Sequence, residues 1–524
     1  MKAYLMFRDR DFDPNAKLSD NSDALIQDLE LDILLNAMSG DDKHIYEISK
    51  IAILTSLSNS DEILYRQAIL KDSIANRATI RELYAIAADA IESKRRNWYG
   101  IYTIYPGAVL HSAARMIEMY MPFLARLRHL ADSASEFKSE GFTRFFAMIQ
   151  NELDDEYFDI IKDHLKYVEF KEGALISSTL GEGLESRRHI LRKSKNFGRT
   201  WLQRVFRQRV PTYSFSISAR DEAGARALSE LKDRGLNFGA NALAQAADHI
   251  ESFFKMLLTE IAFYVGCLNL REKLEHLGEP SNFPVPMPEG SLAVEFSGLY
   301  NICLSLHTGH RTVGSDVLAR GKNPVIITGV NEGGKSTFLR SVGVAQLMLQ
   351  CGIFTPAISF CADIASGVFT HYRRKEDRTM QSGKFDEELA RMELIVRQLR
   401  PHALILFNES FAATNEREGS EIAMQIVRAL VERGVRIYFV THLYTFAAGF
   451  EECAACRPLL LRTESHADGN RTFRIVEGAP SQRSHGEYLY RKVFGESADM
   501  SIGAIPPVEC NDEVSPRTQQ SDER

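Results

Sequence analysis

The sequence predicts a multidomain protein in which an α-helical region with a small β-containing insert precedes an α/β domain. Three observations support this fold class. The chain has 524 residues, which exceeds the size of a single hydrophobic core. Apolar residues recur at helical spacing over residues 20–160 and again over 222–273. Beyond residue 325, short apolar runs alternate with helical patterns, an order typical of a mostly parallel sheet.

The composition is that of an ordinary globular protein, with 44% hydrophobic and 25% charged residues. No uninterrupted apolar run is long enough to span a bilayer, and residues 1–13 lack the hydrophobic segment of a secretory signal. We therefore expect a cytoplasmic protein, nucleoid-associated if it binds DNA, whose seven scattered cysteines are free thiols. The net charge of −7 excludes a polycation that coats nucleic acid indiscriminately, so any contact with DNA must use local positive charge.

Changes in the sequence pattern predict the domain boundaries. Polar breaks at residues 39–42 and 58–61 supply turns and helix N-caps within the first helical region. A Pro-rich break from Pro280 to Pro288 separates the second helical region from the α/β domain. The expected parts are a helical core over 1–165, a basic β-containing insert over 166–220, long helices over 221–280, the α/β domain over 286–498, and a disordered polar tail over 499–524.

Two patterns define the insert. Residues 167–170 and 175–180 are strand-like and flank a Gly-bearing turn, which predicts a hairpin. A run from Arg187 to Arg209 contains no acidic residue and has aromatic residues interleaved. Such a stretch is typical of contact with a nucleic-acid backbone, but a solvated helix face with inward aromatics is an equally weighted alternative. The candidate DNA-contacting residues are Arg187, Arg188, Arg192, Lys193, Lys195, Arg199, Arg204, Arg207 and Arg209.

A Gly-rich stretch carries the most specific motif in the chain. An apolar run over 325–327 leads into Gly329-x4-Gly334-Lys335-Ser336, the P-loop pattern for a nucleoside triphosphate. In such a loop, backbone N–H groups converge on the phosphates, the lysine reaches the β- and γ-phosphates, and the serine hydroxyl binds Mg²⁺. The alternative, a chance Gly-rich turn, does not account for the helical pattern that follows. The predicted nucleotide contacts are Gly329, Gly333, Gly334, Lys335, Ser336 and Thr337.

Two further apolar strands end in polar residues that suit this chemistry. Residues 404–407 precede Asn408 and Glu409, and residues 435–440 precede Thr441 and His442. Glu409 can position or deprotonate the attacking water, whereas the neutral Asn408 predicts weaker Mg²⁺ dependence or slower turnover. A histidine at a strand end is often structural, but here a γ-phosphate sensor is favoured. The predicted catalytic residues are Lys335, Glu409 and His442, and the predicted metal ligands are Ser336 and Asn408.

A polar stretch over residues 381–389 begins the helix that is expected over 387–399. Small polar residues at a helix N-terminus make an anion-binding site. The stretch could therefore complete the nucleotide site of a neighbouring subunit, or it could be an ordinary helix cap.

Taken together, these motifs resemble the MutS family of mismatch-repair ATPases. ITGVNEGGKSTFLRSVG, CGIFTPA, DIASGVFTHY, SGKFDEELARM, LILFNESFAATNEREGSEIA and FVTHLYTFA occur in the family's order and spacing over about residues 291–450. The resemblance implies an α/β P-loop ATPase domain of the ABC/MutS type, preceded by core, clamp and lever regions. It also implies ATP and Mg²⁺ as cofactors, a homodimer that binds DNA, repair-protein partners, Asn331 at the γ-phosphate, and Ser382 or Gly383 near the nucleotide of the opposite subunit.

The sequence also departs from the family pattern. Asn408 stands where the family has an aspartate, and Val330 stands where it usually has a proline. The N-terminal domain with a Phe-x-Glu wedge that reads mismatches has no room before the helical core, and Phe170-Lys171-Glu172 matches the wedge only by chance. The closest resemblance is therefore to truncated MutS-like proteins.

Three functions remain in order of preference. The first is a dimeric ATPase of DNA repair or recombination, whose nucleotide state opens and closes helical arms around DNA. The second is a nucleotide-gated DNA-binding scaffold with little hydrolysis, which Asn408 motivates. The third is another P-loop class, such as a transporter ATPase or a nucleotide kinase, although SGKFDEEL differs from the LSGGQ-type signature of transporters.

Overall fold

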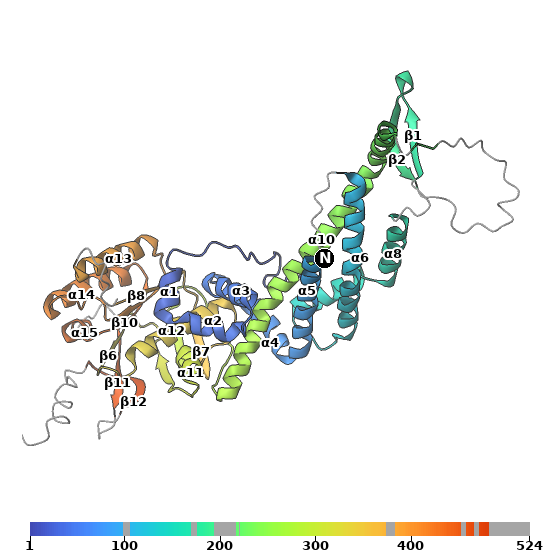
Figure 1. Cartoon of the computed structure of the whole chain (residues 1–524). Helices are drawn as coiled ribbons and strands as arrows, with labels where there is room; N and C mark the ends of the chain where they lie inside the picture. The colour runs from blue at the N-terminus through green and yellow to red at the C-terminus, as the bar shows by residue number, and fades with distance from the viewer. Residues whose placement is uncertain are drawn as a thin grey trace, which may run out of the picture. The chain divides into compact units, whose positions relative to one another are not determined.

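Helices dominate the first 168 residues of the computed structural model, which describes residues 1–97, 105–168, 175–192, 216–218, 221–373, 383–451, 457–465 and 471–480 (Figure 1). They are α1 (Ser22–Leu29), α2 (Leu31–Ser39), α3 (Lys43–Leu54), α4 (Ser60–Ala75), α5 (Arg77–Asn97), α6 (Pro106–Ser133), α7 (Glu140–Glu152) and α8 (Asp155–Val168). The side chain of Asp42 accepts hydrogen bonds from the backbone N–H groups of His44 and Ile45, and Asn59 accepts one from Asp61. The polar breaks are therefore helix starts, as expected.

Helix α10 (Glu222–Leu277) is one continuous helix of 56 residues in the range where long helices were expected. Asp221 caps its N-terminus by accepting a hydrogen bond from the N–H of Gly224, and Gly278 ends it in the left-handed conformation. Its buried apolar residues pack against α2, α3, α5 and α6. By length and composition it contains a stretch that could cross a membrane, but 78% of that stretch is buried inside the protein. It is the central core helix of this region.

The predicted hairpin is present but has a different first strand. Strand β1 (Leu175–Leu180) pairs antiparallel with β2 (Ser186–Arg192), and a 3-10 turn, η1 (Glu182–Leu184), lies between them. The expectation of a strand over 167–170 is wrong for Tyr167 and Val168, which form the last turn of α8. The physical reason is that Phe158, Ile161 and Leu165 continue a helical spacing and pack on the core.

Phe170-Lys171-Glu172 lies outside the described residues. The hairpin itself lies beside the N-terminal half of α10 (Figure 1), where Ile176 fills the space next to Gly235.

The α/β region is built on a six-stranded sheet with the order β12-β11-β6-β10-β9-β8. All neighbouring strands are parallel except the β11–β12 pair, which is antiparallel. Val440 pairs with both Ile327 and Asn408, so the central strands end at the same edge. The strands are β6 (Val325–Thr328), β8 (Val368–Tyr372), β9 (Leu404–Asn408), β10 (Arg436–Val440), β11 (Leu459–Ser465) and β12 (Arg471–Glu477).

Helices cover both faces of this sheet. Side chains alternate along each strand, so Ile327 packs in the cluster that includes α12 (Lys335–Cys351), whereas Ile326 and Phe407 pack on the other face. The helices on that other face are α13 (Lys384–Gln398), α14 (Glu416–Glu432) and α15 (Tyr444–Glu451). This arrangement explains why the strands are continuous apolar runs in the sequence.

A second sheet flanks the first. Its order is β3-β7-β4-β5, and the short helix α11 (Ile302–Thr308) lies between β4 and β5 in the chain. The backbone N–H of Ile475 on β12 donates to the Ser315 hydroxyl on β5, which joins the two sheets. Its strands are β3 (Val285–Met287), β4 (Val294–Leu299), β5 (Ser315–Leu318) and β7 (Ser359–Asp363).

Arg66 joins the helical and α/β regions. Its guanidinium is buried and donates to the backbone carbonyl of Met6 and, over 3.0 Å, to that of Cys351 at the end of α12. Helices α1, α3 and α4 also contact α12. Residues 1–480 accordingly form one compact unit. The expected tail over 499–524 lies outside the described residues.

Candidate nucleotide-binding site

The Gly-rich loop occupies residues 329–334, between β6 and α12. Gly329 and Gly334 have φ angles of 128° and 92°, which L-residues rarely adopt. A Cβ atom at Gly329 would lie 2.2 Å from Oγ1 of Thr463, and one at Gly333 would lie 2.8 Å from its Cγ2. Both conformation and space therefore require glycine. The loop delivers the N-terminus of α12, with its free backbone N–H groups, to the edge where the strands end.

Lys335, the first residue of α12, folds back over this loop. Its Nζ donates to the carbonyl oxygens of Gly329 (2.9 Å) and Val330 (2.8 Å). The side chain is buried, and burial lowers the pKa of Lys335 to about 8, although the nearby Glu409 carboxylate acts in the opposite direction. With a pKa of about 8, the Lys335 side chain is partly neutral near physiological pH.

The two predicted metal ligands contact each other. The Ser336 hydroxyl donates to Oδ1 of Asn408 over 2.9 Å, which joins the first turn of α12 to the end of β9. Both atoms are uncharged oxygen donors, which suit Mg²⁺ in kind but supply no negative charge. Among the described residues, no three His, Cys, Asp or Glu side chains are grouped to hold a metal. The negative charge that Mg²⁺ prefers must therefore come from groups other than Ser336 and Asn408, such as phosphate oxygens.

Glu409 and His442 also come together, from the ends of β9 and β10. The His442 Nε2 lies 2.9 Å from Oε1 of Glu409. Glu409 has a φ of 53°, a sparsely populated conformation that is common at functional sites. The hydrogen bond from His442 lowers the pKa of Glu409, with further help from the charges of His442 and Lys335 and against partial burial. Glu409 is therefore an ionised acceptor held by its neighbour.

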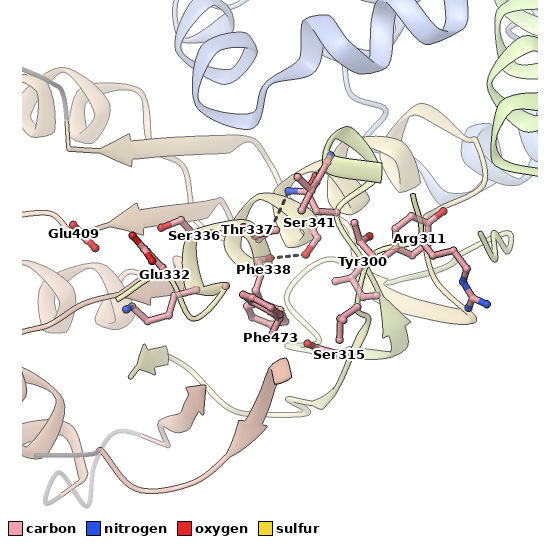
Figure 2. Close-up of a pocket in the computed structure, with 17 residues that line it drawn as sticks. Tyr300, Arg311, Ser315, Glu332, Ser336, Thr337, Phe338, Ser341, Glu409 and Phe473 are labelled. Carbon is pink, nitrogen blue, oxygen red and sulfur yellow. Dashed lines mark hydrogen bonds between the residues drawn. The ribbon is translucent and has the colours of Figure 1, made fainter. Parts of the chain in front are cut away.

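A cavity of about 410 Å³ opens from the start of α12. Figure 2 shows Ser336, Glu332 and Glu409 toward one end and Arg311 beyond Tyr300 toward the other. Sequence reasoning missed the rest of this cavity, because the residues come from four separate segments with no motif of their own. Its lining includes Leu299, Tyr300, Leu304, Arg311, Thr312, Val313, Ser315, Phe338 and Phe473.

A second feature that sequence reasoning missed is an ion pair on the loop itself. Nη1 of Arg471 on β12 lies 2.9 Å from Oε2 of Glu332, which occupies the fourth position of the loop. The only sequence signal is an acidic residue inside an anion-binding loop, which calls for a nearby cation.

Of the remaining predicted residues, Thr337 lines the same cavity as Lys335 and Ser336. Asn331 lies in the loop, and the backbone carbonyl of Thr337 accepts a hydrogen bond from Asn301, which does not involve the predicted nucleotide. Ser382 lies outside the described residues, while Gly383 is the extended residue that precedes α13.

Three candidate DNA contacts, Arg187, Arg188 and Arg192, are exposed on β2, so this part of the basic run is a strand and not a helix face. Arg187 pairs with Glu185 at 3.3 Å, and Arg192 donates to the Ser177 hydroxyl. The other candidates, Lys193, Lys195, Arg199, Arg204, Arg207 and Arg209, lie outside the described residues.

The sheet, the loop and the polar strand ends define a mixed helical and α/β protein with a P-loop sequence at the carboxyl edge of its main sheet. Comparison with known families adds two matches. The family model described as "MutS2 N-terminal domain" matches residues 58–277. The family model described as "MutS domain V" matches residues 325–494.

Curated relatives agree with these matches. A DNA mismatch repair protein MutS from Thermotoga neapolitana is 32% identical over 168 residues, which is 32% of this chain and 21% of the relative. MutS protein homolog 4 from Mus musculus is 26% identical over 234 residues, 44% of this chain and 24% of the relative. The MutS protein of Thermotoga maritima is 36% identical over 121 residues, 23% of this chain and 15% of the relative. The chain is therefore similar to MutS proteins over both matched stretches, and the matches to these relatives span a quarter or less of each relative.

Proposed function

We propose that this protein binds ATP with Mg²⁺ at the loop between β6 and α12 and uses the nucleotide to control binding to DNA. One observation carries the nucleotide part. Residues from the start of α12 and from the ends of β9 and β10 meet around one loop. Ser336 is hydrogen-bonded to Asn408, His442 to Glu409, and Lys335 to the loop carbonyls. Two of the relatives are named as DNA mismatch repair proteins, which supports the DNA part.

The proposed role of each side chain follows from its charge. On binding, Lys335 exchanges the carbonyls of Gly329 and Val330 for phosphate oxygens, and the loop N–H groups hold the same anion. Ser336 and Asn408 would hold Mg²⁺, which when bound neutralises charge on the phosphates. Glu409 accepts a proton from the attacking water, and His442 fixes the orientation of that carboxylate.

The cavity suits the rest of the nucleotide. Tyr300 and Val313 give its far end apolar and aromatic surface, and Phe473 adds an aromatic ring near Gly334; such a lining is appropriate for a purine base. The phosphates then lie at the other end, beside Ser336. A fluorescent ATP analogue should bind more weakly to Phe473→Ala than to the parent, while inorganic triphosphate, which has no base, should compete equally with both.

The neutral Asn408 separates an ATPase from a nucleotide-gated scaffold. We expect the parent protein to hydrolyse ATP slowly in Mg²⁺, Glu409→Gln to bind ATP without turnover, and Asn408→Asp to need less Mg²⁺ because the added charge strengthens the metal site. Steady-state phosphate release, titrated with Mg²⁺, measures all three. Turnover that exists only in Asn408→Asp would favour the scaffold.

For DNA, we propose a homodimer whose helical arms form a clamp, with composite nucleotide sites to which Ser382 or Gly383 of the opposite subunit contributes. The exposed arginines of β2 contact phosphates without reading sequence. The role belongs to DNA repair or recombination with repair-protein partners, in the cytoplasm and on the nucleoid.

A binding panel tests this proposal with mismatched, branched, single-stranded and plain duplex DNA, each without nucleotide, with ADP and with ATP. Affinity should fall steeply with salt, change with nucleotide, and decrease more in Arg188→Gln than in Arg144→Gln, an exposed control on α7. Binding that responds to neither salt nor nucleotide would contradict the clamp, as would a monomeric mass in light scattering with ATP.

A further inference from the structure

The phosphate-binding loop carries a carboxylate of its own. Glu332 follows Asn331 in the loop and has a φ of 56°, and its side chain lines the same cavity as Ser336 and Glu409 (Figure 2). A negative charge at this position opposes an incoming polyphosphate, because like charges a few ångströms apart repel even when water screens them. The loop therefore needs a fixed cation beside Glu332 if it is to accept a highly charged anion.

Strand β12 supplies that cation. Nη1 of Arg471 lies 2.9 Å from Oε2 of Glu332, and the arginine side chain is 30% exposed against 80% for the glutamate. The arginine side chain is thus the more buried of the two partners. Strand β12 also brings Phe473 into the cavity, and the backbone carbonyl of Phe473 would lie 3.4 Å from a Cβ atom at Gly334.

The β11–β12 hairpin is packed on the loop at a second point. Thr463 of β11 fills the space beside Gly329 and accepts a hydrogen bond from the N–H of Val330 over 3.3 Å. The hairpin consequently forms one wall of the loop, and the position of Arg471 is set by the sheet and not by the loop that carries Glu332.

We propose that Arg471 is a specificity-determining residue of the nucleotide site: it neutralises Glu332 and so lets the loop discriminate in favour of triphosphate over diphosphate. This inference rests on the proposed ATP binding. Without the arginine, the uncompensated carboxylate repels ATP more than ADP, because ATP brings one more phosphate and more negative charge. An exposed pair adds little to folding, so the effect falls on nucleotide affinity.

Four proteins test the proposal, each compared with the parent: Arg471→Gln, Glu332→Gln, the double variant, and Arg474→Gln. Arg474 is an exposed arginine of the same strand, and the ion pair to Glu332 is made by Arg471, so Arg474→Gln controls for the loss of one positive charge. Dissociation constants for ATP and ADP are measured with Mg²⁺ at low and high salt. Circular dichroism and melting temperature establish that each variant is folded.

Arg471→Gln should weaken the affinity for ATP by about three- to tenfold and the affinity for ADP by less. Both effects should be smaller at high salt. The loss should vanish in the double variant, Glu332→Gln alone should bind ATP at least as tightly as the parent, and Arg474→Gln should match the parent. An equal loss of ATP affinity in the double variant would mean that Arg471 contacts the nucleotide directly, and this would overturn the proposal. The proposal would also be overturned if Arg471→Gln lost no ATP affinity, or lost ATP and ADP affinity equally. If the parent itself binds neither nucleotide, the proposed function fails and the inference falls with it.

Discussion

Proton uptake by Lys335 is a direct consequence of how the loop holds it. Its ammonium is buried against two carbonyl oxygens, and this burial lowers the pKa of Lys335 to about 8. A bound triphosphate replaces those weak partners with anionic oxygens, which favour the charged lysine and raise its pKa well above the working pH. Binding of ATP should therefore draw a proton from solution onto Nζ wherever the free lysine is partly neutral.

The magnitude follows from that pKa. A group that titrates near 8 is about one-tenth neutral at pH 7, about half at pH 8 and about nine-tenths at pH 9. ATP binding should thus take up about 0.1, 0.5 and 0.9 protons at these three values. By linkage, the affinity for ATP should fall about tenfold from pH 7 to pH 9. The phosphate groups do not obscure this effect, because their last ionisation, near pH 6, is complete at pH 8 and 9.

Calorimetric titration measures the proton count. ATP is titrated with Mg²⁺ into the protein at pH 8, in buffers of different ionisation enthalpy, and the slope of the observed enthalpy against buffer enthalpy is the number of protons taken up. Lys335→Arg is the matched variant, because arginine stays charged at every pH tested and should give a slope near zero if it still binds. Tight ATP binding by the parent with no proton uptake at either pH 8 or pH 9 would refute the reasoning.

Two other predictions concern a glycine of the loop and a buried glutamate of the helical region. Gly329→Ala should weaken ATP binding more than tenfold and lower the free energy of unfolding by about 1–3 kcal/mol, because its φ is 128° and its Cβ meets Thr463 at 2.2 Å. Gly309→Ala, with open space around its Cβ, should retain ATP affinity in the same titration. In the helical region, burial raises the pKa of Glu260 to about 7. The native state then binds more protons than the unfolded state between about pH 4.5 and 7, so the free energy of unfolding should fall by up to about 3 kcal/mol as pH rises through this window. Urea unfolding at pH 5 and 7.5 should show that decline in the parent and not in Glu260→Gln; an equal decline in both would assign it to other groups.

Local features of the site could be predicted from the sequence. The P-loop spacing, the helical pattern that follows it, and the apolar strands before Asn408 and His442 each depend on residues that are close in the chain. Hydrophobic period, glycine conformation and capping act over a few residues, and they require no knowledge of the rest of the fold.

The β1–β2 hairpin shows that local information is not sufficient to predict which segments pair as strands. Residues 167–170 and 175–180 look like a strand pair, but the preceding helical periodicity extends through Val168, and the strand at Leu175 pairs with the first part of the basic run. Both arrangements satisfy local propensity. In the observed arrangement, the hairpin packs against α10, and Ile176 fills the space beside Gly235.

The sequence alone determined the family resemblance and the loop, since both reside in short motifs. Only the tertiary structure decided which distant residues complete the site. Phe473 and Arg471 reach the loop from strand β12, 139 positions beyond Glu332 in the case of the arginine, and Arg66 meets the end of the loop's helix from 285 positions away. Such neighbours are set by strand order and by helix packing, which are properties of the whole chain. For that reason no local pattern in the sequence predicted them.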